Sequence, residues 1–392
     1  MSETILVSVT GVDGPGITAG LLHILDDAGA RVLDMEQVVV RDRLNLGMLV
    51  ALEGPVSPLK DMLFFAWERG IDVDFEVVDP PDDAPLPARY AVTVIGEELR
   101  PAALGAVADA IVTGGGNIER IARLSKYPVI SYELLIVGGD FGALRSHLLH
   151  ASSTHRVDIA IQREGLRRRA KRLVVIDVDS TLIRDEMIDT LAGHNGAGSE
   201  VSELTTRSMA GDVDFERSLR DRVSLLEGLE AATVDRVAAD VALTPGARTF
   251  VRTLRRLGFT IAIVSGGFTR IVEPIRRELG IDRAYANTLE IKDGFLTGRL
   301  EGRILDGPAK AEILAEIAAE EEIPLEQTVA VGDGANDMEM LSLAGLGIAF
   351  NAKPIVGAAA DTSLTVPYLD AILFLLGIRR EEIEDADRSA PL

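Results

Sequence analysis

Two carboxylates, one residue apart, follow an apolar run near the middle of the chain. The segment VVIDVDSTLIRDE places Asp177 and Asp179 directly after residues 174–176, a run typical of a buried strand. Side chains two residues apart share one face of a strand, so both carboxylates can address one site. Adjacent buried carboxylates repel each other unless a cation offsets them, and a hard ion such as Mg²⁺ prefers oxygen ligands. A helix N-cap would explain one of these aspartates but not both.

Two other apolar runs also end in polar residues. The run IAIV leads into Ser265, Gly266 and a second glycine, and free backbone N–H groups at the start of a helix bind anions. The run VAV leads into GDGAND, which contains Asp333, Asn336 and Asp337. Taken singly, the first is a common strand-to-helix turn and the second a surface turn before a capped helix. Because ligands of open α/β sheets bind at the carboxyl ends of strands, three such ends together predict one shared site.

An isolated lysine lies between the second and third strand ends. Lys310 stands in ILDGPAKAEIL, at the start of a predicted helix. A lysine in such a position is more often solvated than functional. Its significance therefore depends wholly on the three strand ends.

The segments that carry these residues belong to a predicted doubly wound α/β domain. Strands alternate with helices there, so we expect this domain to span about residues 170–380. The stretch 187–243 between the first two strand ends is too long for a loop, and its pattern predicts helices. The acidic tail, residues 381–392, is expected to fray. The basic segment 163–172 is interpreted as a solvated connecting helix.

Ahead of that domain the order strand–helix–strand–strand–helix–strand occurs twice. The first copy covers residues 1–79 and the second residues 89–165, and this order is the ferredoxin-like split pattern. Between them lies DPPDDAPLPA, whose prolines and aspartates neither pack nor continue a helix, so we interpret residues 80–88 as a linker. The chain therefore reads as two small α/β repeats followed by a larger α/β domain.

Composition excludes several functional classes. The 392 residues are 47% hydrophobic and 26% charged, which is typical of a globular protein with enough apolar material for its cores. The formal net charge of −22 argues against binding to nucleic acids or anionic membranes, since both need a basic surface. The absence of cysteine excludes disulfides, cysteine nucleophiles and thiolate metal sites. We see neither a signal peptide nor an apolar run of roughly 20 residues, and therefore expect a cytoplasmic protein.

In this order DVDST, SGG, the isolated lysine and GDGxND resemble the phosphotransferases of the haloacid dehalogenase type, whose fold is a Rossmann-like domain. The resemblance covers about residues 173–380. It implies that Asp177 attacks phosphorus to form an aspartyl-phosphate, and that Asp179 protonates the leaving oxygen and then activates water. It also implies Mg²⁺ held by the Asp177 side chain, the Asp179 backbone carbonyl and Asp333, with Asp337 supporting the metal site from outside.

The same resemblance implies a cradle for the phosphoryl group. Ser265, the Gly266 N–H and Lys310 would hold its oxygens, and Asn336 would belong to the same set. Lysine and Mg²⁺ would neutralise charge that an acidic protein does not otherwise offset.

In that family the helices of residues 187–243 form a cap over the active site. DVDSTLIRDEMID, followed by TTRSMAGDVDFERSLRDRVSLL, is similar to the phosphoserine phosphatases. The similarity implies that Glu186 accepts the ammonium of phosphoserine and that Arg222 clamps its carboxylate, although Arg222 alone equally fits a surface ion pair. Met209 and Phe215 would line an apolar wall that excludes water, although their spacing alone equally fits helix core.

The two N-terminal repeats resemble tandem ACT domains, which commonly bind amino acids at interfaces between paired copies. In the first repeat GVDGPG places Asp13, Gly14 and Gly16 in a turn whose backbone can approach a ligand closely, although a tight turn alone would also select glycine. The second repeat has IGEELRPAALG at the same place and lacks DGPG. We expect the second and third strands to offer edges for pairing, and hence a homodimer with serine as feedback effector.

The histidines carry no predicted role. His147 and His150, one helical turn apart, have no third ligand nearby in the sequence and are interpreted as surface residues. His194 is interpreted as a residue of a cap loop. Metal binding is therefore expected at the aspartates alone.

The expected activity is Mg²⁺-dependent hydrolysis of O-phosphoserine to serine and phosphate, the last step of serine biosynthesis. One alternative is a phosphomonoesterase of the same family that acts on phosphohomoserine or a phosphorylated sugar acid. Another is an amino-acid sensor with a relic catalytic domain, against which the filled catalytic positions speak. An ion-pumping ATPase with the same aspartyl-phosphate chemistry would need transmembrane segments.

Overall fold

The computed structural model describes residues 3–52, 57–79, 87–209 and 214–389. The chain divides into two compact units, Met1–Leu86 and Pro87–Leu392. The predicted linker, residues 80–88, falls almost entirely outside the described residues. Among the helices that the structure describes, none is long and apolar enough to cross a membrane.

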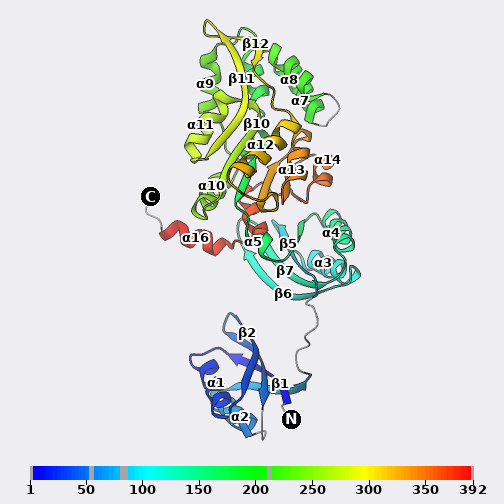
Figure 1. Ribbon diagram of the computed structural model, residues 1–392, viewed down its shortest axis with the longest axis vertical. Coiled ribbons are helices and arrows are strands. Elements are labelled where there is room, and N and C mark those ends of the chain that lie inside the picture. Colours follow the sequence, from blue (N-terminus) through cyan, green and yellow to red (C-terminus); the bar gives the residue numbers. More distant parts are fainter. Residues whose placement is uncertain (1–2, 53–56, 80–86, 210–213, 390–392) are drawn as a thin grey trace. The chain divides into compact units, whose positions relative to one another are not determined.

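The first unit is a four-stranded antiparallel sheet with two helices (Figure 1). Its elements are β1 (Glu3–Val12), α1 (Ile17–Asp27), β2 (Arg31–Val40), β3 (Arg43–Leu52), α2 (Ser57–Arg69) and β4 (Ile71–Val78). Alternation along β1 buries Ile5, Val7 and Val9 on one face. Leu21 and Leu25, one turn apart on α1, are buried in the same core. The alternating apolar residues of β1 and the apolar residues one turn apart on α1 are therefore buried in one core between the sheet and the helix.

The strand order of this sheet is β2-β3-β1-β4. The second strand is an edge, as expected, and no residue along it is buried. The prediction for the third strand was wrong, because β3 pairs with β2 on one side and with β1 on the other. The split connection carries β4 to the far side of β1, so β4 is the second edge.

The second unit begins with the repeated order. Its first elements are β5 (Arg89–Gly96), α3 (Pro101–Thr113), β6 (Gly116–Ser125), β7 (Ile130–Gly138), α4 (Phe141–His155) and β8 (Asp158–Arg163), with strand order β6-β7-β5-β8. Val92 and Val94 of β5 pack with α3 and α4. Ile95, on the opposite face, and Ala160 of β8 belong to the core of the following domain. This repeat is therefore buried on both faces of its sheet.

The rest of the second unit is a seven-stranded sheet with helices on both faces (Figure 1). Its strands are β9 (Leu173–Ile176), β10 (Thr260–Phe268), β11 (Arg283–Lys292), β12 (Phe295–Glu301), β13 (Thr328–Gly332), β14 (Gly347–Phe350) and β15 (Thr362–Leu364), in the order β12-β11-β10-β9-β13-β14-β15. Neighbours are parallel except β11 and β12, a hairpin that sequence analysis did not predict. Asp293 and Gly294 form its turn with φ of 49° and 87°.

The helices of this domain fall into a cap and two sheet-covering layers. They are α5 (Leu166–Arg169), α6 (Met187–His194), α7 (Gly198–Met209), α8 (Phe215–Ser224), α9 (Ala231–Ala239), α10 (Ala247–Arg256), α11 (Thr269–Leu279), α12 (Gly307–Glu320), α13 (Met338–Leu343), α14 (Pro354–Ala359), α15 (Ile372–Leu375) and α16 (Arg380–Ser389). Helices α6 to α9 occupy the predicted cap segment, and His194 is the last residue of α6. The predicted helical insertion is confirmed, but the loop position predicted for His194 was wrong, because α6 continues to that residue and is capped by Asn195.

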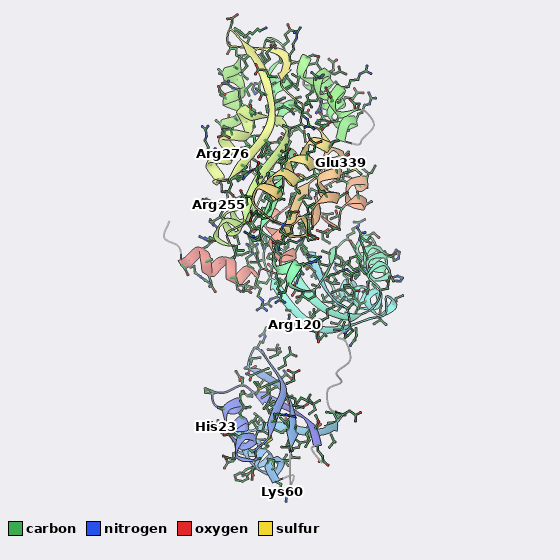
Figure 2. The ribbon with its side chains drawn as sticks, in the orientation of Figure 1. His23, Lys60, Arg120, Arg255, Arg276 and Glu339 are labelled. Carbon is green, nitrogen blue, oxygen red and sulfur yellow. The ribbon has the colours of Figure 1, made fainter. Side chains whose placement is uncertain are left out.

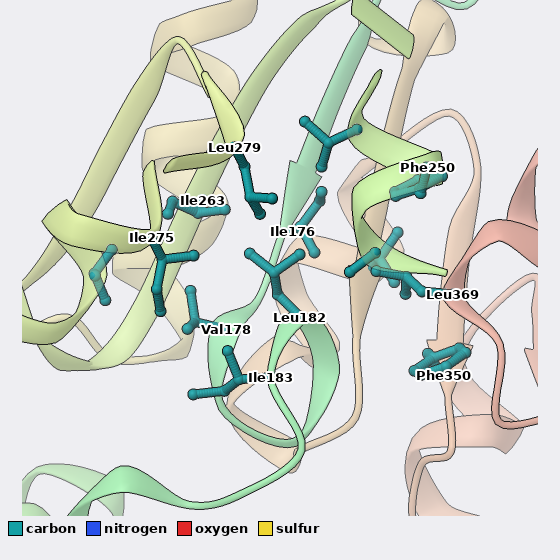
Figure 3. Close-up of a cluster of buried hydrophobic side chains, with 14 of the residues drawn as sticks. Ile176, Val178, Leu182, Ile183, Phe250, Ile263, Ile275, Leu279, Phe350 and Leu369 are labelled. Atoms are coloured by element: carbon teal, nitrogen blue, oxygen red, sulfur yellow. The ribbon is translucent and has the colours of Figure 1, made fainter. Parts of the chain in front are cut away.

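The central strand β9 is completely buried. Val174 and Ile176 belong to the core on one side of the sheet, and Leu173 and Val175 to the core on the other. Figure 3 shows Ile176 among the side chains of the first of these cores. Because a strand that is apolar on both faces is stable only between other strands, the run before Asp177 determines its central position.

The surface predictions for the second unit hold only in part. Most residues of the basic segment 163–172 are exposed, as expected, but Arg168 is 7% exposed and pairs with Glu133 and Glu164. The acidic tail does not fray over its described part but forms α16. Arg380 of α16 bonds to Asp370 at 2.8 Å, and Ile383 is buried. Tertiary ion pairs and apolar contacts outweigh the local charge repulsion.

Most other ion pairs lie at the surface. Arg276 of α11, labelled in Figure 2, bonds to Glu273 at 2.7 Å on the same helix. Exposed pairs of this kind contribute little to stability, because water and salt screen them. Lys310 is the contrasting case, because its ion pairs are completely buried.

Candidate active site

The predicted residues meet at one edge of the seven-stranded sheet. Strand β9 lies between β10 and β13 in parallel register, so Asp177, Ser265 and Asp333 come where three neighbouring ladders end. The Asp177 N–H donates to Val331 O at 2.9 Å, which extends the pairing with β13 to the first of these residues. The three polar residues therefore lie together at the carboxyl ends of neighbouring parallel strands, as the sequence predicted.

Lys310 bridges two buried carboxylates. Its Nζ lies 2.6 Å from Asp177 Oδ1 and 2.7 Å from Asp337 Oδ1. The lysine belongs to the first turn of α12, where Asp306 caps the helix by accepting from the Ala309 N–H at 2.9 Å. Burial by itself lowers the pKa of Lys310, but Asp177 and Asp337 raise it above its usual value overall. Lys310 is therefore a charged part of the site and not a solvated residue.

Three carboxylates form an oxygen-rich cluster. Oxygen atoms of Asp177, Asp333 and Asp337 all lie within 4.8 Å of one another. Burial raises the pKa of Asp177 and that of Asp333 well above their usual values, and the neighbouring carboxylates add to the effect. The single positive charge of Lys310 does not balance the negative charge of three carboxylates. A set of carboxylates without nitrogen or sulfur ligands fits a hard divalent ion such as Mg²⁺ better than zinc.

Asp337 shapes the loop that presents Asp333. Its Oδ2 accepts from the Asp333 N–H at 3.2 Å and from the Gly334 N–H at 3.0 Å. A Cβ atom at Gly332 would lie 2.5 Å from Asp337 Cγ, so only glycine fits there. Both oxygens of Asp337 thus bond to protein groups, which suits support of a metal site from outside.

Asp179 is held from two sides. Its Oδ1 accepts from the Met187 N–H at 3.0 Å, and its Oδ2 accepts from Ser265 Oγ at 3.0 Å. The chain turns sharply after it, with Ser180 in the left-handed region at φ 56°. Burial raises the pKa of Asp179, and the two hydrogen bonds oppose that rise. The carboxyl group is thereby directed into the same pocket as Asp177.

The two glycines after Ser265 allow close approach of other groups. The Gly267 N–H donates to Ser265 Oγ at 2.8 Å. A Cβ atom at Gly267 would lie 2.6 Å from Asp179 Oδ2, and one at Gly266 would lie 2.9 Å from Phe215 Cζ. Bare backbone therefore faces the pocket at this point, as an anion cradle requires.

Cap residues complete the pocket. Ser180 Oγ donates to Glu186 Oε1 at 2.8 Å, and burial, with Asp179 nearby, raises the pKa of Glu186 to about 8. Arg222 is 4% exposed and donates to Ser218 O and Thr205 Oγ1, both neutral atoms. Burial lowers the pKa of Arg222. A buried guanidinium bound by neutral groups leaves capacity for an anion.

One pocket unites these groups. Phe215 is half-buried and belongs to its wall, whereas the side chain of Met209 lies outside the described residues. The pocket is lined by Asp177, Asp179, Glu186, Ile188, Phe215, Leu219, Arg222, Gly266, Gly267, Phe268, Asp333 and Asn336. Acid groups of the sheet edge and polar groups of the cap thus face a common space.

Several supporting residues escaped the sequence analysis. Thr181, fully buried, donates to Asp333 Oδ1 at 3.1 Å, and Thr244 Oγ1 donates to Thr181 O at 2.7 Å. Thr205, besides accepting from Arg222, donates to Asp189 Oδ1 at 2.6 Å. The place of Thr181 beside DVDS was a usable signal. Thr205 and Thr244 had none, because their partners come from distant segments.

The other predicted residues lie away from this pocket. In the first unit, Asp13, Gly14 and Gly16 form the β1–α1 turn, with Gly16 in the left-handed region at φ 86°. In the second unit, His150 is exposed and His147 half-buried on α4. Among the residues described, the aspartate cluster is the group that brings three possible ligand atoms together.

Comparison with known proteins separates the chain into the same parts. The haloacid dehalogenase-like hydrolase family matches residues 174–342. ACT domain families match residues 3–76 and residues 88–162. The Rossmann-like domain and both ACT domains are therefore confirmed.

Two relatives match along nearly the whole chain, and solved structures match large parts of it. The phosphoserine phosphatase of Streptomyces coelicolor is 49% identical and covers 99% of this chain and 95% of its own. Phosphoserine phosphatase SerB2 of Mycobacterium tuberculosis is 46% identical, with coverages of 98% and 95%. A substrate-bound phosphoserine phosphatase structure covers 53% of this chain and 99% of its own at 45% identity, with a TM-score of 0.51. A probable phosphoserine phosphatase structure from Vibrio cholerae covers 76% and 89% at 33% identity, with a TM-score of 0.59. This chain belongs to the phosphoserine phosphatases of the haloacid dehalogenase-like hydrolase family, with two ACT domains before the catalytic domain.

Proposed function

We propose that the protein hydrolyses O-phospho-L-serine to L-serine and inorganic phosphate through an aspartyl-phosphate on Asp177. The observation that carries the proposal is the shared pocket, in which two sheet-edge aspartates face Glu186 and Arg222 of the cap. Phosphoserine carries a phosphate, an ammonium and a carboxylate. The pocket offers a complementary group for each of the three.

In the first step Asp177 acts as nucleophile. The oxygen of Asp177 that does not bond to Lys310 attacks phosphorus, and the bond between phosphorus and the serine oxygen breaks. Asp179 gives its proton to that oxygen, so serine leaves as a neutral alcohol. The raised pKa of Asp179 suits this role, because burial favours the protonated carboxyl group over the carboxylate.

In the second step Asp179 acts as base. It takes a proton from water, the water oxygen attacks phosphorus, and the bond to Asp177 breaks to release phosphate. One residue serves both steps because the leaving alcohol and the incoming water occupy the same place in turn. The bond from Ser265 Oγ keeps Asp179 Oδ2 in place between them.

The phosphoryl oxygens are held by Ser265, the Gly266 N–H, Lys310 and Asn336. Mg²⁺ would be held by the Asp177 side chain, the Asp179 carbonyl and Asp333, where it offsets negative charge on the phosphoryl group. Asp337 supports that arrangement through its bonds to the Asp333 loop. Positive groups fixed before the reaction lower the barrier without reorganisation.

Specificity for serine comes from the cap. Glu186 accepts the ammonium and Arg222 the carboxylate, while Phe215 excludes water and Met209 is proposed to assist it. The deciding experiment compares phosphate release from O-phosphoserine, from phosphohomoserine and from the phosphoserine analogue that lacks the amine, each with Mg²⁺ and with EDTA. Preference for either of the other esters would replace the proposed substrate. No turnover of any ester with Mg²⁺ would support a sensor with a relic catalytic domain.

The ACT domains provide amino-acid regulation. We propose that serine binds at the turn of Asp13, Gly14 and Gly16 in a homodimer and lowers activity by feedback. The left-handed Gly16 at the start of α1 and the exposed edge of β2 support this assignment. Native mass spectrometry with and without serine tests it, together with turnover at rising serine concentration. A strict monomer whose activity serine does not change would contradict it.

A further inference from the structure

A buried asparagine outside the predicted set holds the peptide that directly follows the Gly266 N–H, one of the proposed phosphate donors. Asn287 lies on β11 and is 2% exposed. Its Nδ2 donates to Gly266 O at 2.8 Å, and its Oδ1 accepts from the Leu305 N–H at 2.9 Å. The amide thus joins two backbone segments that are distant from it in the chain.

The need for this side chain comes from a break in the sheet. Strands β10 and β11 pair regularly up to Val264 and Tyr285, and again at Phe268 and Asn287. Between these points β10 has three residues and β11 has one, so residues 265–267 leave the ladder as a bulge. A buried carbonyl without a hydrogen-bond partner destabilises the fold. Asn287 supplies to Gly266 O the partner that the strand backbone does not.

The peptide between Gly266 and Gly267 is therefore held at both of its polar atoms. Its oxygen accepts from Asn287, and its N–H donates to Ser265 Oγ at 2.8 Å. Ser265 then donates its own proton to Asp179 Oδ2 at 3.0 Å. Glycines rotate more freely than other residues, so the two bonds are what keep this peptide in a single orientation.

The second bond of Asn287 reaches the other side of the phosphate position. Leu305 directly precedes Asp306, the residue that caps α12, and α12 carries Lys310 in its first turn. A single amide thus ties the Gly266 loop to the start of the lysine helix. Both segments supply groups that hold the phosphoryl oxygens in the proposed function.

We propose that Asn287 is a positioning residue for phosphoryl transfer. By fixing the peptide that directly follows the Gly266 N–H, together with the approach to α12, it keeps the Gly266 N–H and Lys310 directed at the transferring group. The inference rests on the proposed function, because it concerns the same phosphate cradle. Donors fixed in advance act most strongly on the charge of the transition state, so their loss lowers kcat more than it raises KM.

The test compares two substitutions in the full-length protein. Asn287→Asp keeps the acceptor for Leu305 but replaces the donor to Gly266 by an oxygen. The matched control is Thr328→Val. Thr328 is fully buried at the opposite, amino end of β13, where its Oγ1 donates to Leu325 O at 2.7 Å and accepts from the Gly345 N–H at 3.2 Å. Both variants thus remove a buried side chain that joins two backbone segments.

We expect N287D to lower kcat for O-phosphoserine by about 10- to 100-fold while KM changes by less than about threefold. We also expect the backbone N–H of Gly267 to exchange its hydrogen with solvent faster than in wild type. T328V should lower the melting temperature by a similar amount without either effect. Equal kcat in the two variants, after correction for the folded fraction, would overturn the inference. If N287D does not fold, N287L is measured against the same criteria.

A separate binding measurement distinguishes this inference from the proposed substrate. Orthovanadate mimics the transferring phosphoryl group, and its binding is followed by thermal shift in the presence of Mg²⁺. N287D should bind vanadate at least about tenfold more weakly than wild type, whichever phosphate ester proves to be the substrate. Equal vanadate affinity would overturn the role of Asn287 even where phosphoserine turnover is confirmed. Absence of phosphoserine turnover in the wild type would remove only the proposed substrate.

Discussion

Lys310 Nζ lies 2.6 Å from Asp177 Oδ1, although 133 positions separate the two residues in the chain. The same nitrogen lies 2.7 Å from Asp337 Oδ1. Together with Asp333, these aspartates outnumber the lysine and leave two formal negative charges, which one divalent cation cancels. The charge balance of the site therefore depends on a lysine whose sequence context alone predicts a solvated residue.

Asp177→Asn removes the proposed nucleophile while keeping the shape of the side chain. We expect phosphate release from O-phosphoserine to fall by at least about 10³-fold, because an amide oxygen does not form the covalent intermediate. Asp282→Asn is the control, since Asp282 Oδ2 accepts from the Ile261 N–H at 2.8 Å at the other end of β10. Turnover that survives in D177N would refute the covalent mechanism.

Lys310→Met leaves Asp177 and Asp337 without their counter-charge. Breaking a buried ion pair costs about 3–5 kcal/mol, so the metal-free variant should lose about that much free energy of unfolding near pH 8. We expect Mg²⁺ to restore part of the stability but not the turnover, which should fall by at least about 100-fold. Urea unfolding and phosphate release measure the two effects. The exposed Lys292→Met is the control, and equal behaviour of the two variants would count against the role of Lys310.

Gly267→Ala tests the close approach of the Ser265 loop to Asp179. The new Cβ would lie 2.6 Å from Asp179 Oδ2, so the carboxyl group must move. A displacement of about 1 Å costs about 100-fold in rate, and we expect a fall in kcat of that order. Gly105→Ala on α3 has no atom within 4 Å of its new Cβ and should leave kcat unchanged. Wild-type kcat in G267A would show that Asp179 tolerates the shift.

Glu186 predicts a pH dependence of stability in the metal-free protein. Burial raises its pKa to about 8 in the folded state, against 4.5 for the ordinary side chain. Between these pH values the unfolded chain releases the proton that the folded chain retains, so stability from this group falls as pH rises and is lowest above pH 8. Glu186→Gln has no such proton. We therefore expect E186Q to raise the free energy of unfolding relative to wild type at about pH 9.

The experiment for Glu186 is urea unfolding with EDTA at two pH values. At pH 4.5 the glutamate is protonated in the folded protein, so the gain of E186Q should disappear there. The same difference between E186Q and wild type at both pH values would show that its pKa is not raised. Glu216→Gln, an exposed residue that pairs with Arg220 on α8, controls for general charge effects.

Arg222→Gln tests recognition of the substrate carboxylate. We expect KM for O-phosphoserine to rise by about 10- to 100-fold, because a buried charged hydrogen bond is lost. Phosphoethanolamine lacks that carboxylate, so its kcat/KM should change little. Arg220→Gln, on the exposed side of the same helix, should affect neither substrate. Parallel losses for both substrates in R222Q would mean that Arg222 has only a structural role.

Short-range patterns accounted for most of the elements that position the site. Continuous apolar runs placed β9 and β13, and the doubling of the βαββαβ order is present as two separate sheets. The hairpin of β11 and β12 was missed although its Asp293–Gly294 turn was a readable signal. The third-strand edge was wrong, because strand order within a sheet is a property of pairing and not of each strand alone.

Contacts between distant segments were not predictable in the same way. Sequence context favoured fraying of the tail, yet Arg380 forms an ion pair with Asp370 and Ile383 is buried in an apolar core. Arg168 likewise pairs with Glu133 of the second ACT domain. Each partner becomes a neighbour only after the sheets have assembled, so no local pattern around either residue records it.

The sequence by itself determined the chemistry that this protein can perform, because residue types and their spacing within DVDST, SGG and GDGAND are local properties. Only the tertiary structure decided which groups complete that chemistry. Lys310 forms ion pairs with Asp177 and Asp337, and Asn287 donates a hydrogen bond to Gly266 O. These contacts depend on a bulged parallel sheet that brings separate strands to one edge. The physical reason is that hydrogen bonds and ion pairs act over a few ångströms in space, irrespective of distance along the chain.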